Sequence, residues 1–248
     1  MSEQPIQVVV WDENPPHASK EHYPASVRGA VATALRELGG DELVVHVAHQ
    51  DEPGQGVPAD LLARTDVLLW WAHLRHGDIA DETADRVVER VRRHGLGFIG
   101  LHSAHYAKTL QRVLGCTGDL KGGWREDDQP EEISVCAPRH PIAAGITDFT
   151  LPQEEMYGAP FDVPPPAVVI FQSFFPAGGE YFPSGLAWTV GQGIDPGFAS
   201  GPGKGLGQGE GIGRVFYFRP GHETNPTYHD PSVQRILFNA VRWAAKRT

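Results

Sequence analysis

Short apolar runs alternate with amphipathic helical segments through the first half of the chain. Residues 6–11, IQVVVW, are almost continuously apolar, which is typical of a strand that is buried on both faces. Residues 25–38 then carry apolar side chains at a helical period, and this pattern stops at Gly39 and Gly40. Repetition of this pattern predicts right-handed βαβ units. We therefore expect an α/β fold with a parallel central sheet and helices on both faces.

The expected elements follow one another closely up to residue 114. Strands are predicted at residues 6–11, 41–48, 67–71 and 98–101, and helical segments at 25–38, 60–62, 81–93 and 104–114. Between residues 116 and 213 the alternation of strands and helices is interrupted by an elaborated, loop-rich region. This region includes a Gly-rich stretch at residues 191–213. Further strands are expected in it at residues 167–171 and 186–190. The alternation of strands and helices resumes with a predicted strand at residues 215–218 and a C-terminal helix at residues 232–245. We expect a single domain over residues 1–248.

The composition of the chain limits which kinds of binding partner and which cellular compartment we expect. The formal net charge is −10 and no basic block is present, which argues against nucleic acid and against an anionic membrane surface. Cys116 and Cys136 are the only cysteines and form no CxxC motif, so a disulfide framework is not implied. The N-terminal residues lack a signal-peptide pattern, and no apolar run reaches membrane-spanning length. We expect a cytoplasmic protein.

Eight of the twelve histidines fall in four short clusters near the ends of predicted strands. These clusters are His17/His22, His73/His76, His102/His105 and His222/His229. The carboxyl ends of parallel strands share one edge of a sheet, so residues far apart in sequence converge there. A rim of imidazoles at that edge is the layout of an active site.

The fourth predicted strand ends in GLHSAH at residues 100–105, which resembles a nucleophile elbow with His102 at its apex. His105 follows at helical spacing, and Ser103 could act at the site or merely cap the helix. We expect His102 to stay neutral because it faces a helix N-terminus.

The loop after the fifth parallel strand places His222 beside Glu223. Such a pair can act as a general base with its orienting acid, or as metal ligands. Arg219 precedes this pair, and His229 follows it, either in the site or as a loop histidine. The HxxH spacing of His73 and His76 could also hold a metal, but the spacing alone is weak support.

Aromatic and acidic groups near the same rim favour a carbohydrate ligand. Glu155 and Tyr157 lie in the segment QEEMYG, which is either a substrate-facing loop or a solvated acidic turn. Trp11, which closes the first strand, and Trp124 add aromatic faces near this rim, although core packing accounts for most tryptophans. The predicted substrate-binding residues are Trp11, His73, His76, Ser103, His105, Glu155, Tyr157, Arg219 and His229, the predicted catalytic residues are His102, His222 and Glu223, and the candidate metal ligands are His102, His105 and His222.

Several stretches resemble the trehalose-utilisation (ThuA-like) family. They are VVVW, LLWWAHLRHGDI, GFIGLHSAHYAK, QEEMYG and VFYFRPGHETNPTYHDPSVQRILFNAVRWA, and together they span most of the chain. The resemblance implies a flavodoxin-like sheet related to class I glutamine amidotransferases. In those enzymes a cysteine occupies the elbow and works with a histidine and a glutamate after a later strand. Here His102 stands at the cysteine position, so glutamine hydrolysis is not expected.

The resemblance also implies use of trehalose or a related disaccharide, alongside an oxidoreductase that makes 3-keto sugars. Three readings follow. The first is a sugar-processing hydrolase, lyase or isomerase that uses His/Glu acid–base chemistry, with a divalent metal such as zinc as a candidate cofactor. The second is a non-catalytic sugar-binding accessory subunit, and the third a Ser103-dependent hydrolase, which no GxSxG motif supports. A small-molecule carbohydrate is the expected partner, and a homo-oligomer is compatible with all three.

Overall fold

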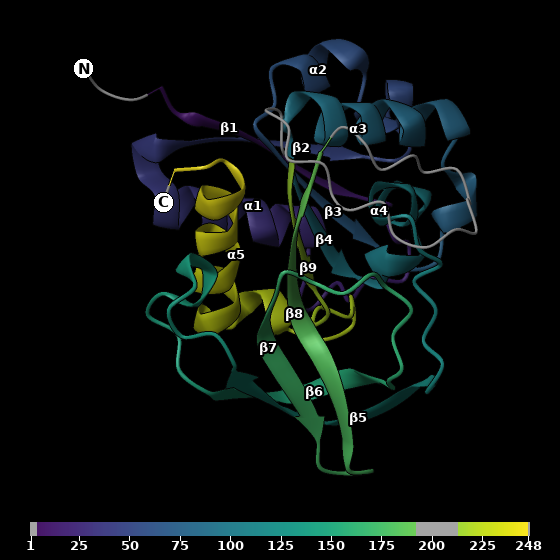
Figure 1. The fold of residues 1–248 in the computed structure, drawn as a ribbon, viewed down its shortest axis with the longest axis vertical. Coiled ribbons are helices and arrows are strands. Elements are labelled where there is room, and N and C mark those ends of the chain that lie inside the picture. The colour runs from purple at the N-terminus through teal and green to yellow at the C-terminus, as the bar shows by residue number, and fades with distance from the viewer. Residues whose placement is uncertain (1–3, 192–212, 248) are drawn as a thin grey trace.

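A computed structural model describes residues 4–191 and 213–247. Its centre is one nine-stranded mixed sheet with the order β2-β1-β3-β4-β9-β8-β7-β5-β6 (Figure 1). The first five strands in this order are mutually parallel, and each later neighbour is antiparallel. The prediction of an α/β fold with a parallel central sheet is confirmed.

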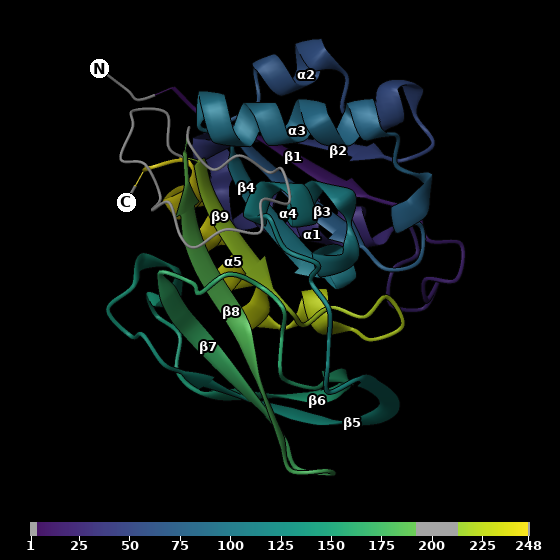
Figure 2. The same cartoon turned by 45° about the vertical axis from the view of Figure 1, so that its right-hand side comes forward.

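The parallel half is built from strands that alternate with helices along the chain. Its strands are β1 (Ile6–Asp12), β2 (Leu43–His49), β3 (Val67–Ala72), β4 (Gly97–His102) and β9 (Gly213–Phe218). Its helices are α1 (Val27–Gly39), α2 (Ala59–Ala63), α3 (Asp81–His94), α4 (Lys108–Leu114) and α5 (Pro231–Ala244). Helices α1 and α5 cover one face of the sheet, and α2, α3 and α4 lie on the other (Figures 1 and 2).

Alternate side chains of each central strand enter the two cores. In β1, Val8 and Val10 pack towards α1 and α5, whereas Val9 and Trp11 pack towards α3 and α4. All four are at most 1% exposed. Because both faces of these strands are buried, their sequences are continuous apolar runs and do not alternate between apolar and polar residues.

The elaborated region supplies the antiparallel half of the sheet. Its strands are β5 (Trp124–Val135), β6 (Phe149–Tyr157), β7 (Val168–Phe175) and β8 (Glu180–Val190). The expected strands at 167–171 and 186–190 are parts of β7 and β8, but β5 and β6 were not expected. Apart from residues 191 and 213, the Gly-rich stretch predicted as a loop lies outside the described residues.

Two other boundaries differ from the sequence prediction. The segment after β4 forms a short 3-10 helix (Ser103–Tyr106) before α4, instead of one helix over residues 104–114. The second strand starts after a 3-10 turn (Gly40–Glu42) rather than at residue 41. Neither difference moves the carboxyl ends of the strands.

The register aligns those carboxyl ends at one edge. Asp12 pairs with Trp71, Ala72 pairs with His102, and Leu101 pairs with Phe218. The loops that follow β1, β3, β4 and β9 therefore start side by side. This alignment positions the candidate site.

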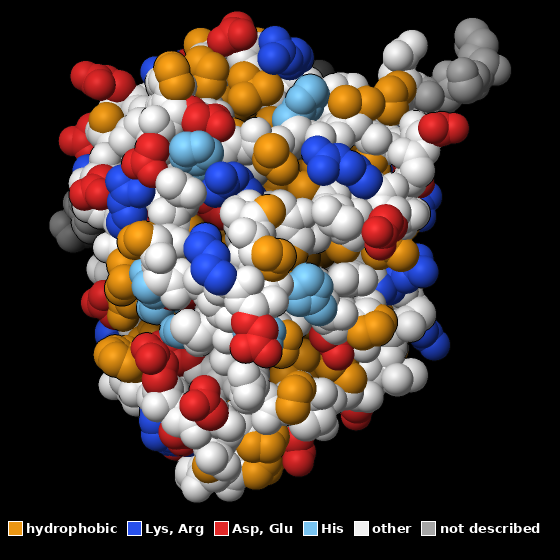
Figure 3. All heavy atoms as spheres, turned by 180° about the vertical axis from the view of Figure 1, so that it is seen from behind, with side chains coloured by type: hydrophobic (Ala, Val, Ile, Leu, Met, Phe, Trp, Pro, Cys, Tyr) orange, Lys and Arg blue, Asp and Glu red, His pale blue; other side chains and the backbone are white. Residues whose placement is uncertain are grey.

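The surface shows no concentration of one charge on the face opposite to Figure 1, where acidic and basic side chains are interspersed (Figure 3). No helix in residues 4–191 and 213–247 is long and apolar enough to cross a lipid bilayer.

Candidate functional site

A pocket of about 440 Å³ opens at the carboxyl edge of the parallel strands. One wall comes from loops after these strands, and the other comes from the antiparallel half, through β5 and the end of β6. This volume lies in the usual range for small-molecule sites. The lining residues are His17, His73, Leu74, Ser103, Tyr106, Leu120, Trp124, Glu126, Glu155, Tyr157, His222, Glu223 and Thr224.

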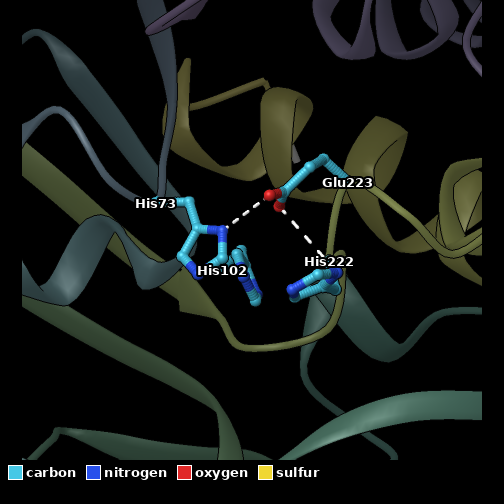
Figure 4. A group of neighbouring side chains, drawn as sticks. All are labelled: His73, His102, His222 and Glu223. Atoms are coloured by element: carbon cyan, nitrogen blue, oxygen red, sulfur yellow. Dashed lines mark hydrogen bonds and ion pairs between the residues drawn. The ribbon is translucent and has the colours of Figure 1, made fainter. Parts of the chain in front are cut away.

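Three imidazole rings gather next to the Glu223 carboxylate (Figure 4). The ring centroids of His73 and His102 are 5.0 Å apart, those of His73 and His222 are 4.9 Å apart, and those of His102 and His222 are 5.3 Å apart. We expected these four residues at one edge of the sheet from their positions after predicted strands, and the structure brings them together.

His102 lies fully buried at the end of β4, beneath the pocket. Its backbone has φ 55° and ψ −125°, a left-handed conformation that is rare for a residue with a side chain and marks a sharp turn. Its ring stacks on Trp71 at 5.9 Å, and its carbonyl accepts a hydrogen bond of 2.8 Å from Tyr217. These contacts hold the imidazole in one orientation.

The His102 imidazole is held neutral, as expected, but mainly for a different reason. Burial lowers its pKa well below the usual value, and the nearby charges of His73, His222 and Arg219 lower it further. The segment that follows is a four-residue 3-10 helix. Desolvation therefore replaces the helix dipole as the principal cause.

His73 and Glu223 form the polar link between β3 and β9. Nδ1 of His73 lies 2.7 Å from Oε1 of Glu223, and His17 contacts the same oxygen from the loop after β1. Burial alone would lower the pKa of His73, but the hydrogen bond and charge of Glu223 outweigh it and raise this pKa. The same hydrogen bond overcomes the effect of burial on Glu223 and lowers its pKa. Each partner therefore favours the charged form of the other.

Glu13 positions the His73 loop. Both of its carboxylate oxygens accept backbone N–H hydrogen bonds, from Leu74 at 2.7 Å and from Arg75 at 2.9 Å. Glu13 is 1% exposed, so the loop after β3 is tied to the end of β1 by a buried carboxylate.

Glu155 and His222 face the pocket from different halves of the sheet. Oε2 of Glu155 lies 3.4 Å from Nε2 of His102, and Nε2 of His222 lies 3.6 Å from the carboxylate of Glu126. Burial raises the pKa of Glu155 to about 7, although His73 and Arg219 oppose the shift. Burial lowers the pKa of His222, with Glu223 opposing it. Glu155 can therefore exchange protons near neutral pH, and the neutral form of His222 is favoured.

Arg219 lies behind the pocket wall and does not line it. Its side chain is fully buried, where the guanidinium contacts the carboxylate of Glu131 and the backbone carbonyl of Glu155, and lies 3.4 Å from the carboxylate of Glu154. Glu154 in turn accepts a 3.0 Å hydrogen bond from the backbone N–H of Gly221, next to His222. The prediction placed Arg219 at the substrate, whereas the structure makes it a positioning residue that joins β6 to the His222 loop.

Trp11 corrects another expectation. It was predicted at the substrate, but it is 0% exposed and stacks on Trp70 at 3.6 Å, with its indole N–H donating to the carbonyl of Gln55. Its position in β1 directs it towards the core between the sheet and α3, because side chains alternate between the two faces.

His105 also turns away from the pocket. It is fully buried, and Nδ1 donates a 2.7 Å hydrogen bond to the carbonyl of Gly118. Burial lowers its pKa to about 3. Its ring packs against the aromatic rings of Tyr106, Tyr157, Phe161 and Tyr217.

His76 and His229 lie outside the residues that line the pocket. The ring of His76 is 6.0 Å from that of Tyr106, and burial lowers its pKa. His229 is exposed, stacks on Tyr23 at 5.4 Å, and contacts the carbonyl of His22 through Nε2 at 2.7 Å. Among the described residues, neither ring packs against the rings of His73, His102 or His222.

Ser103 and Tyr157 both line the pocket and are hydrogen-bonded to each other. The hydroxyl of Tyr157 also lies 3.5 Å from Nδ1 of His102. Within the described residues, no histidine is hydrogen-bonded to the hydroxyl of Ser103. This geometry gives no support to a Ser–His nucleophile.

The candidate site residues from the sequence did not include His17, Glu13 or Glu126. His17 belongs to a histidine cluster in the loop after the first strand, so its position in the sequence already indicated that it could lie near the site. Glu126 and Trp124 lie on β5, a strand that the charged sequence WREDDQPEEISV did not reveal.

One protein-family model matches almost the whole chain and shows which family it belongs to. A model described as ThuA, trehalose utilisation, matches residues 7–244. The chain belongs to the trehalose-utilisation family. Membership supports a role in trehalose utilisation, and it agrees with the resemblance noted in the sequence. No curated protein matches the sequence.

Solved structures confirm the fold. A cytoplasmic protein from Salmonella typhimurium aligns with a TM-score of 0.61 at 14% identity, covering 96% of this chain and 99% of that one. A glutamine amidotransferase from Thermotoga maritima aligns with a TM-score of 0.53 at 11% identity, covering 97% and 98%. A β-galactosidase from Rahnella sp. R3 aligns with a TM-score of 0.58 at 12% identity, covering 98% of this chain and 32% of that one. At these identities the likeness concerns the fold alone.

Proposed function

We propose that this member of the trehalose-utilisation family transforms a sugar in its pocket by acid–base chemistry, and that the sugar is a keto derivative of trehalose or of a related disaccharide. The observation that carries the proposal is the convergence of three imidazoles and two carboxylates, those of Glu155 and Glu223, at one pocket, which all of them line except the buried His102 beneath it. Such groups move protons to and from hydroxyl, carbonyl and glycosidic oxygens.

The proposed division of roles follows from position. His222 and Glu155 line the pocket from the β9 loop and from β6, so either can reach a bound oxygen. Glu223 holds His73 through the 2.7 Å hydrogen bond and thereby orients it. His102 is neutral and lies below the pocket floor, where it can polarise a substrate oxygen.

The substrate test uses product analysis. The purified protein is incubated with trehalose and with 3-keto sugars made by a sugar oxidoreductase, which is the class of reaction that would supply this substrate. NMR and mass spectrometry identify the products. We expect the keto sugar to be consumed and trehalose to be left unchanged. Binding of the sugars without turnover would favour the accessory-subunit reading.

The exposed aromatic side chain at the pocket mouth should contribute to sugar affinity. Trp124 is 61% exposed and Leu74 is 64% exposed, and both line the pocket. An indole face stacked on a pyranose contributes roughly 0.5–1.5 kcal/mol, so we expect Trp124→Ala to raise KM about 2- to 10-fold. Tyr181→Ala is the matched control, because Tyr181 is 60% exposed but does not line the pocket. Equal KM values for Trp124→Ala and the wild-type protein would remove Trp124 from the substrate site.

Cysteine chemistry should be dispensable. Burial raises the pKa of Cys116 to about 12, and Cys136 lies on the surface with a raised pKa. Neither residue lines the pocket. We expect alkylation of both thiols to leave turnover unchanged. Loss of activity with an unchanged circular dichroism spectrum would contradict a mechanism without a thiol.

A further inference from the structure

Two histidines at the pocket bury ring nitrogens that make no hydrogen bond within the part of the chain that the structure describes, although a carboxylate oxygen lies 3.4 Å from Nε2 of His102 and another 3.6 Å from Nε2 of His222. Nε2 of His102 and Nε2 of His222 are buried and have no hydrogen-bond partner among the described residues. The same holds for Oε2 of Glu155 and Oε2 of Glu223. Each unpaired buried polar atom costs about 1–3 kcal/mol. Four such atoms in one pocket indicate that the site is built to hold a group that they bind.

The protein already engages Nδ1 of His73 and of His222, whereas Nδ1 of His102 lies 3.5 Å from the hydroxyl of Tyr157. Nδ1 of His73 lies 2.7 Å from the carboxylate of Glu223, and Nδ1 of His222 lies 2.7 Å from the hydroxyl of Thr224. A hydrogen bond at one ring nitrogen sets the tautomer and orients the other nitrogen for a ligand, as at metal sites where a carboxylate supports a histidine. Thr224 offers Nδ1 of His222 two partners, its hydroxyl at 2.7 Å and its backbone N–H, which donates to Nδ1 at 3.3 Å. Binding of an ion by Nε2 requires that Nδ1 carries the proton and donates it to the hydroxyl, and that the longer backbone contact is given up.

We propose that His73, His102 and His222 bind a divalent transition-metal ion such as zinc, with one coordination position open to the pocket. Each of these residues, together with Glu223, offers a ligand atom within 4.8 Å of the others. A tetrahedral zinc ion with Zn–N bonds of about 2.0–2.1 Å needs nitrogens roughly 3.3 Å apart, so the ligand atoms would draw together by at most about 1.5 Å on binding.

The donor set selects the class of ion. Imidazole nitrogens suit zinc and its neighbours in the first transition row, whereas magnesium and calcium prefer sites made of oxygen ligands. Three protein ligands with an open position are typical of catalytic zinc rather than of structural zinc. The nearby carboxylates of Glu155, 3.4 Å from His102, and Glu223 balance the charge of the ion.

A bound ion would supply a Lewis acid that polarises a sugar carbonyl or hydroxyl oxygen. His222 would then serve as a ligand, and Glu155 would be the group left to transfer protons. The inference does not depend on the proposed function, because metal binding is measured with no sugar present.

The test is calorimetric titration of chelator-treated protein with Zn²⁺, together with the visible absorption spectrum after Co²⁺ addition. We expect one ion per chain and a four-coordinate Co²⁺ spectrum. His102→Ala and His222→Ala should each weaken binding by on the order of 100-fold or more, and Glu223→Gln by about 10- to 100-fold. His46→Ala, which removes an exposed histidine of β2, is the control and should bind like the wild-type protein.

Two results would overturn the inference. One is wild-type protein that binds no Zn²⁺. The other is undiminished binding by a folded His102→Ala or His222→Ala protein. Circular dichroism establishes folding, and should the buried His102 variant fail to fold, His222→Ala at the pocket wall decides the question.

Discussion

Replacement of Glu155 by glutamine is expected to lower turnover by about 10²–10⁴-fold while sugar binding and folding persist. Glutamine keeps the shape and hydrogen-bonding capacity of the side chain but cannot transfer a proton. Glu155 is 4% exposed, lines the pocket, and lies 3.4 Å from Nε2 of His102. Steady-state kinetics on the sugar that the wild-type protein transforms measure the effect.

Glu126→Gln is the matched control for this prediction. Glu126 lines the same pocket, but its side chain is 52% exposed and lies 3.6 Å from His222. We expect a change in turnover of less than about tenfold, because an exposed carboxylate can be replaced by water in proton transfer. Equal losses in the two variants would show that Glu155 has no special role.

Arg219→Met should cause the largest loss of stability. The guanidinium is fully buried between the carboxylates of Glu131 and Glu154, and its removal leaves two acidic groups without their cation. Breaking such a buried cluster costs about 3–5 kcal/mol. For a chain of this size, this corresponds to a decrease in melting temperature of roughly 6–20 °C.

Arg125→Met provides the comparison at the surface. Arg125 also contacts two carboxylates, those of Asp127 and Glu180, but it is 32% exposed. Exposed ion pairs contribute about 1 kcal/mol or less, so its melting temperature should change little. Thermal unfolding of both variants measures the difference. A loss of stability no larger for Arg219→Met than for Arg125→Met would contradict a structural role for the buried cluster.

The parallel half of the fold could be predicted because its signal is local. Apolar runs buried on both faces mark β1, β3 and β4, and intervening helical periods imply parallel connections. The placement of His73, His102 and His222 followed from their position just after three strands. The shared edge then brings them together without any knowledge of side-chain conformation.

The antiparallel half could not be predicted in the same way. Strand β5 (Trp124–Val135) is acidic and largely exposed, so it lacks the apolar alternation of a strand. Its one fully buried carboxylate, on Glu131, is paired with Arg219, 88 residues away. No local pattern reveals such a pair. The role of Arg219 therefore became clear only from the structure.

The sequence also did not show in which direction individual side chains point. Trp11 pairs in register with Trp70, and both point to the face covered by α3 and α4 rather than to the pocket. His105 is one turn beyond His102 along a 3-10 helix, and its ring enters an aromatic cluster. Proximity in sequence to a site residue did not determine whether a side chain reaches the pocket.

The most direct measurement follows the imidazole NMR signals of the wild-type protein during addition of the keto sugar. Three buried or half-buried histidines, His73, His102 and His222, form the proposed site, whereas His46 is exposed on the edge strand β2. The account predicts that the signals of the three site histidines shift together and saturate with the sugar, while that of His46 stays unchanged. Turnover or binding of the sugar without any shift of these three signals would contradict it.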